Sequence, residues 1–197
     1  MKLAVLDEFL SEKNLRDQVE VINNLYEPSD AILKFTARSE VFMDQARAAV
    51  RTYEEFVELI RSHLLQLVND TERVGPTSKD MGNICDIISS HPRLGENKNL
   101  SIHSQNEQKN LQKNRDSAEI QARLKELNEE YEKVYPGLKF IVFVNGRKRP
   151  EIIKLMEERV GSGNTWFEEA RVAMNELCDI AQDRIKKWEV ESLQSKY

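Results

Sequence analysis

The sequence predicts an all-α fold, a single-domain helical bundle with one short extended segment near residues 140–144. The 197-residue chain is 40% hydrophobic and 32% charged but has only seven glycines and five prolines, a composition that favours helices over a turn-rich β fold. Apolar residues recur at i, i+3 and i+4 spacing through most of the chain. A chain of this length can bury a sizeable core, so residues 1–197 are expected to form one domain.

Helix signals are frequent in the first 90 residues. Apolar spacing predicts helices at 3–10, at 15–26, from Ser29 onward, at 52–68 and at 79–90. Residues 41–50 either continue the helix that begins after Ser29 or start a new one. Pro28 ends the second of these, and Thr52 with Glu55 forms a capping box. Residues 70–78, with a turn at Gly75–Pro76, read as a linker. His63 lies on an apolar stripe, where a histidine is more often a core residue than a ligand.

The second half of the chain starts with a polar stretch and ends with regular helices. Residues 93–103 lack apolar periodicity, and the charged stretch 106–133 predicts one or two solvent-facing helices with a break near Asp116–Ser117. Pro136–Gly137 ends that stretch, and the apolar run 140–144 is too short for a helix, which predicts a buried extended segment. Beyond an Asn145–Gly146 turn, helices are predicted from Pro150 to Val160, before Gly161, and from a cap at Asn164 or Thr165 through Trp188.

Composition and termini narrow the class of protein. The net charge is −5 and basic residues are interspersed with acidic ones, so a nucleic-acid partner is not expected. No apolar run approaches the roughly 18 residues that span a bilayer, so no membrane partner is expected. Cys85 and Cys178 are far apart in apolar patterns and read as reduced, buried residues. The C-terminal Ser195-Lys196-Tyr197 resembles a peroxisomal S-K-L address except at its last residue, which leaves a peroxisomal or a cytoplasmic location open.

The stretch from Ile88 to Gln108 carries the candidate chemistry. Pro92 biases His91 out of the α region, so a helix reaching Ser90 should end there and present the imidazole at its end. Ser104 and Glu107 stand three apart, as in a capping box, yet a histidine and a glutamate also suit proton transfer. The sequence has no phosphate-binding glycine loop and no metal-spaced His and Cys set, so neither a cofactor nor a metal is expected. From these residues alone, helix capping and catalysis both stay open.

Three features together resemble the OHCU decarboxylase family. They are His91-Pro92 before a polar loop, S-x-x-E-Q at 104–108, and the run Phe140–Val144 after a helix. The resemblance implies an all-helical fold, commonly a homodimer. It also implies cofactor-free decarboxylation of a small molecule, 2-oxo-4-hydroxy-4-carboxy-5-ureidoimidazoline, to (S)-allantoin in urate breakdown.

The resemblance also assigns roles to particular residues. It implies His91 as the catalytic acid or base and Glu107 as its partner. The substrate-binding positions that it implies are Pro92, Ser104, Gln108, Val142, Val144 and Arg147. One departure affects the last of these, because many members have an arginine directly after the apolar run, where this chain has Asn145. Arg147 either takes over that role with its forked guanidinium or is a solvated turn residue.

Two alternatives to this activity remain. Asn145 suggests an acid/base enzyme of the same fold that acts on a related ureido or imidazolone acid. The charged seam from Gln112 to Glu132 suggests a non-catalytic helical interaction module.

Overall fold

The computed structural model describes residues 3–11, 14–95 and 118–194, and the side chains of these residues up to Trp188. The all-α prediction is confirmed, because these ranges contain helices and no strand. The helices are α1 (Leu6–Phe9), α2 (Leu15–Tyr26), α3 (Asp30–Phe35), α4 (Glu40–Ala49), α5 (Tyr53–Val74), α6 (Asp80–Ser90), α8 (Ala118–Val134), α9 (Arg149–Val160) and α10 (Trp166–Gln194).

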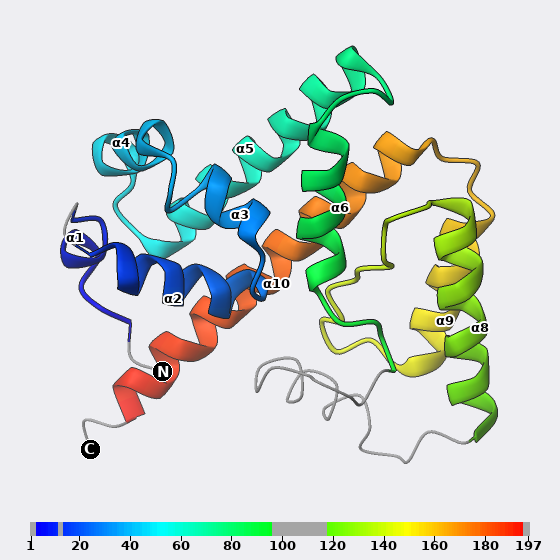
Figure 1. The fold of residues 1–197 in the computed structure, drawn as a ribbon. Helices are drawn as coiled ribbons and strands as arrows, with labels where there is room; N and C mark the ends of the chain where they lie inside the picture. The colour runs from blue at the N-terminus through cyan, green and yellow to red at the C-terminus, as the bar shows by residue number, and fades with distance from the viewer. Residues whose placement is uncertain (1–2, 12–13, 96–117, 195–197) are drawn as a thin grey trace.

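The long helices α5 and α10 lie side by side and run in opposite directions through the molecule (Figure 1). Helices α1 to α4 lie at one end of this pair, α8 and α9 lie at the other, and α6 crosses between them (Figure 1). The contact is apolar on both sides: Phe56, Ile60 and Leu64 of α5 and Met174 and Ile185 of α10 are fully buried. Burying one stripe of each helix is what stabilises such amphipathic segments in a bundle.

Side-chain caps set several helix starts where the sequence predicts them. The hydroxyl of Ser29 accepts the backbone N–H of Ile32 at the start of α3, and Ser39 does the same for α4, which is therefore a new helix and not a continuation. At α5, Thr52 accepts the N–H of Glu55, whose carboxylate in return accepts the N–H of Arg51. The N–H groups that Ser29, Ser39 and Thr52 accept are ones that the first turn of a helix leaves without partners.

The predicted linker at 70–78 is only partly right. Helix α5 continues to Val74, so the first half of this stretch is helical and the chain turns at Gly75, whose φ is +89°. The polar composition of the stretch suggested a loop, but Thr71 is buried and nothing before Gly75 breaks a helix. The Gly75–Pro76 turn itself falls where it was predicted.

The apolar run 140–144 belongs to no helix and no sheet, and its first three residues are buried, as predicted. A segment without a ladder needs other partners for its backbone groups. The carbonyl of Ile141 accepts Arg159 at 2.6 Å, and the N–H of Phe143 donates to Glu176 at 2.6 Å. The chain then reverses at Asn145–Gly146, where both residues have positive φ.

A buried polar cluster surrounds that Arg159 contact. Glu169 of α10 pairs with Arg159 of α9 and also accepts the hydroxyl of Tyr131 from α8. The guanidinium lies 4.5 Å from the centre of the Phe140 ring. Because Glu169 is fully buried, these partners replace the water contacts that its carboxylate loses, and the cluster joins three helices to the extended segment.

The remaining structural expectations have mixed outcomes. His63 bonds Gln45 at 2.8 Å and meets the Phe42 ring edge-on, which is a structural role. Both cysteines are free: Cys178 is buried, but Cys85 is only half-buried. No helix in the described ranges is both long enough and apolar enough to cross a membrane.

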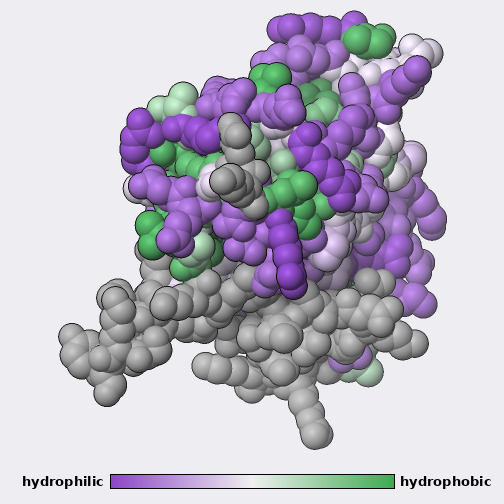
Figure 2. Space-filling view, turned by 60° about the vertical axis from the view of Figure 1, so that its left-hand side comes forward, coloured by the Kyte–Doolittle hydropathy of each residue, from purple (hydrophilic) through white to green (hydrophobic). Residues whose placement is uncertain are grey.

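The surface seen in Figure 2, over the N-terminal helices, is mainly hydrophilic, with hydrophobic patches that hydrophilic residues separate. Homodimer formation stays a prediction. The compartment also stays a prediction, and Ser195-Lys196-Tyr197 lies outside the described residues. The expected break at Asp116–Ser117 lies outside them as well.

Replacing Arg159 by methionine should lower the free energy of unfolding by about 3–5 kcal/mol, because Glu169 would stay buried without its cation. Urea unfolding measures this change. The control Lys154→Met removes an exposed pair with Glu158 and should cost less than about 0.5 kcal/mol. Equal losses in the two variants would contradict a central role for the buried cluster.

Candidate functional site

His91 lies at the C-terminal end of α6, as the following proline predicts. Its backbone is extended (φ −72°, ψ 134°), and its N–H still donates to the carbonyl of Ile88. Helix α6 therefore ends at Ser90, and the chain leaves it through His91 and Pro92. The last turn is anchored in the core by Ile87 and Ile88, both buried. The imidazole is thus presented at the end of a fixed helix.

Downstream of Pro92 the chain is tied to α8. Arg93 forms a two-pronged ion pair with Glu132, with both N–O distances 2.6 Å. Asn128 donates to the carbonyl of Leu94 at 3.1 Å. The planar fork of an arginine gives such a pair directional strength. The residues that follow His91 are consequently held in place as far as the described chain extends.

A second buried ion pair, between Glu27 and Arg184, acts on His91 electrostatically. Arg184 of α10 contacts the carboxylate of Glu27 at 3.0 Å and donates to the carbonyls of Asn24 and Leu25 at the end of α2. Glu27 has a φ of +67°, an unusual conformation for a residue with a side chain. The guanidinium therefore provides hydrogen-bond donors for the last carbonyls of α2 and, through Glu27, holds the turn into α3.

The surroundings of His91 favour its neutral form. Burial is the main reason that the pKa of the imidazole falls from 6.5 to about 3; the charge of Arg184 adds to the fall, Glu27 opposes it, and Lys139 adds to it. The residue as a whole keeps some exposed surface, but its Nδ1 atom is shielded from solvent and has no hydrogen-bond partner in the structure as described. At neutral pH the ring is uncharged and can accept a proton.

The other predicted site residues have varied positions. Val142 is buried in the core and Val144 is half-buried, both on the segment that follows Lys139. Ser104, Glu107 and Gln108 lie outside the described residues. Their roles stay predictions.

Arg147 lies in surroundings different from those of His91. Its guanidinium donates to the carbonyl of Phe143 at 2.8 Å, and the side chain is exposed. It lines a hollow of about 550 Å³ with Arg61 of α5 and acidic residues of α10 such as Glu176. His91 is not among the residues that line this hollow. The structure therefore does not bring Arg147 and His91 together there, and its substrate-binding role stays a prediction.

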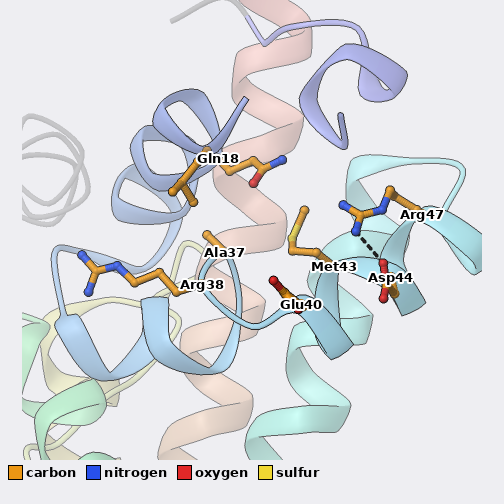
Figure 3. Close-up of a pocket in the computed structure, with 8 residues that line it drawn as sticks. Gln18, Ala37, Arg38, Glu40, Met43, Asp44 and Arg47 are labelled. Carbon is orange, nitrogen blue, oxygen red and sulfur yellow. Dashed lines mark hydrogen bonds and ion pairs between the residues drawn. The ribbon is translucent and has the colours of Figure 1, made fainter. Parts of the chain in front are cut away.

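Another hollow, of about 630 Å³, lies among α2, α4 and the turn that connects α3 to α4 (Figure 3). Arg47 pairs with Asp44 at its rim, and Met43 and Gln18 also line it (Figure 3). His91 does not line it, so it offers no support to the candidate chemistry. In the ranges that the structure describes, no three His, Cys, Asp or Glu side chains are grouped as metal ligands.

Sequence reasoning missed the charged neighbours of His91: Glu27, Lys139 and Arg184. One signal was available for Arg184, because it falls at core spacing between Ile180 and Trp188 on the apolar stripe of the last helix. A charge at such a position is expected to have a buried partner. The sequence does not show which residue that partner is.

Comparison with known proteins identifies relatives of this chain. A family model described as OHCU decarboxylase matches residues 11–186. The uric acid degradation bifunctional protein of Bacillus sp. (strain TB-90) is 32% identical over 101 residues, which cover 51% of this chain and 20% of that protein. The crystal structure of (S)-allantoin synthase matches with a TM-score of 0.59 at 18% identity, over 94% of this chain and 54% of its own, which shows a shared fold. Because the family model covers most of its length, this chain belongs to the OHCU decarboxylase family.

Proposed function

We propose that this protein decarboxylates 2-oxo-4-hydroxy-4-carboxy-5-ureidoimidazoline to (S)-allantoin, as a cofactor-independent carboxy-lyase of urate breakdown. Membership of the OHCU decarboxylase family supports the reaction class. The observation that carries the proposal is the neutral imidazole of His91, presented at the end of α6 with a solvent-shielded Nδ1. An imidazole that is uncharged at neutral pH is in its base form, and this is the form that can accept a proton.

The substrate itself can accept the electrons that decarboxylation releases. Its carboxylate is attached to a carbon next to a ring C=N bond, so the bonding electrons move into the C=N system as CO₂ leaves. The ring nitrogen of that C=N bond receives the electrons and takes up a proton. The hydroxyl on the carbon that lost CO₂ then gives up its proton and becomes a carbonyl, while the carbon that carries the ureido group takes up a proton. What remains for the protein is to move these protons, stabilise the developing negative charge and protonate one face.

His91 is the residue proposed to move the hydroxyl proton. Because its resting form is neutral, it starts as a base, and the imidazolium that forms can then act as an acid. Glu107 is proposed to orient the ring or the substrate hydroxyl, and its position lies outside the described residues. Protonation of one face would give a single enantiomer of allantoin.

A related ureido acid is the second candidate substrate. The observation that favours it is the position of Arg147, which lies over its own turn beside α5 and α10. If Arg147 does not bind the substrate, another residue has to bind the substrate group assigned to Arg147, or the true substrate lacks that group. Turnover of freshly generated substrate, compared with a panel of ureido and imidazolone acids, separates the two candidates.

Replacing His91 by alanine should lower kcat/KM by about 10²- to 10⁴-fold, since the group that moves the proton is lost. Circular dichroism at a wavelength where (S)-allantoin absorbs follows both rate and chirality, after subtraction of the spontaneous reaction. The matched control is His63→Ala, which removes a half-buried histidine with a structural partner, Gln45. Full rate and a single enantiomer in the His91 variant would refute the proposed role.

The pH profile of kcat/KM should reflect the unusual state of His91. The pKa of the free protein's imidazole is about 3, so the residue stays in its base form from neutral pH down to well below pH 6.5. Protonation of His91 should therefore lower kcat/KM only as the pH falls to about 3. Initial rates at a series of pH values test this, and an acid limb centred at the ordinary histidine pKa of about 6.5 would contradict it.

A further inference from the structure

The end of α6 is held by a lysine from a distant part of the chain. The ammonium of Lys139 donates to the carbonyl of Ser89 and, at 3.3 Å, to the carbonyl of His91 itself. The last carbonyls of a helix have no partner inside the helix, and a cation there is also favoured by the helix dipole. Lys139 therefore binds the carbonyls of the residues at which α6 ends, including that of His91 itself.

The backbone of Lys139 is itself fixed. It directly precedes Phe140 and Ile141, which are buried, and the carbonyl of Ile141 is bonded to Arg159. The side chain of Lys139 is half-buried and extends from this anchored segment to the end of α6. With Arg93 bound to Glu132 downstream, the chain around His91 is held on both sides.

Three charged groups from separate elements act on the imidazole of His91. Glu27 follows α2, Arg184 belongs to α10, and Lys139 precedes the extended segment. Glu27 and Arg184 form an ion pair with each other, so their opposite charges partly cancel at the ring. Lys139 differs from both because it also bonds to the backbone carbonyl of His91.

We propose that Lys139 is a positioning residue for His91: by bonding the carbonyls of Ser89 and His91 it fixes where the imidazole is presented. Its positive charge has a second effect, since a nearby cation favours the uncharged ring. The inference rests on the proposed function, in which His91 moves protons. A lysine at this place links the segment that carries Val142 and Val144 to the end of α6.

The test uses three variants of the full chain. Lys139→Met keeps most of the stem but removes the ammonium, and Lys139→Arg restores a cationic donor. Arg51→Met is the matched control, because Arg51 bonds the carbonyls of Ala48 and Val50 at the end of α4 in the same manner. Circular dichroism confirms that each variant is folded.

The first measurement needs no substrate. The imidazole carbon signals of His91, assigned with the His91→Ala variant, are followed by NMR from neutral pH down to the lowest pH at which the fold persists. In Lys139→Met these signals should differ from wild type and should move toward the protonated position at a higher pH than in wild type, because a cation that lowers the pKa of the imidazole is gone. Lys139→Arg should return toward wild type, and Arg51→Met should match it. Signals identical in Lys139→Met and wild type at every pH would overturn the proposal.

The second measurement concerns turnover. Misplacing a reacting group by about 1 Å can cost on the order of 100-fold in rate, so kcat of Lys139→Met should fall by roughly 10- to 100-fold while KM changes by less than about threefold. Lys139→Arg should recover most of kcat. An unchanged kcat in Lys139→Met also overturns the proposal. A wild-type protein that does not accelerate the decarboxylation would refute the proposed function, while the NMR comparison would still decide whether Lys139 positions His91.

Discussion

The ion pair between Arg159 and Glu169 determines how the irregular part of this fold is built. The segment from Phe140 to Val144 has no strand beside it, so its backbone groups need partners from side chains. Arg159 supplies one to Ile141, and Glu169 keeps the buried guanidinium paired. Such a pair contributes little net stability compared with an apolar core, but removing one partner is expensive. The contacts of this pair with Ile141 and Tyr131 join α8, α9 and α10 to the segment.

The position of Lys139 in the candidate site depends on these contacts. With Ile141 fixed, Lys139 is placed where its ammonium reaches the end of α6 and the carbonyl of His91. Fifteen residues after Glu169 on the same helix, about 22 Å along its axis, Arg184 forms the second buried pair with Glu27. Helix α10 thus carries one member of each pair. One pair fixes the lysine that contacts His91. In the other pair Arg184 contributes to the low pKa of the imidazole, and Glu27 opposes it.

Much of the fold could be predicted because the signals act over a few residues. Ser29 and Thr52 are predicted helix starts, and their side chains cap α3 and α5. Pro92 predicts that α6 ends at Ser90, directly before His91, and it does. The linker at 70–78 was partly wrong, since polar composition alone does not end a helix that keeps Thr71 in the core. For the site, the histidine at a helix end was predictable, but its charged neighbours were not.

The sequence by itself determined the helical periodicity, the caps, the turn at Asn145–Gly146 and the extended conformation of His91, because sterics and hydrogen bonds over about four residues specify each of these. Only the tertiary structure decided that Lys139 reaches His91 and that Arg184 pairs with Glu27, 157 positions away. It also decided that Arg147 lies beside α5 and α10. The physical reason is that burial and charge pairing depend on which elements pack together, and no local pattern records that choice.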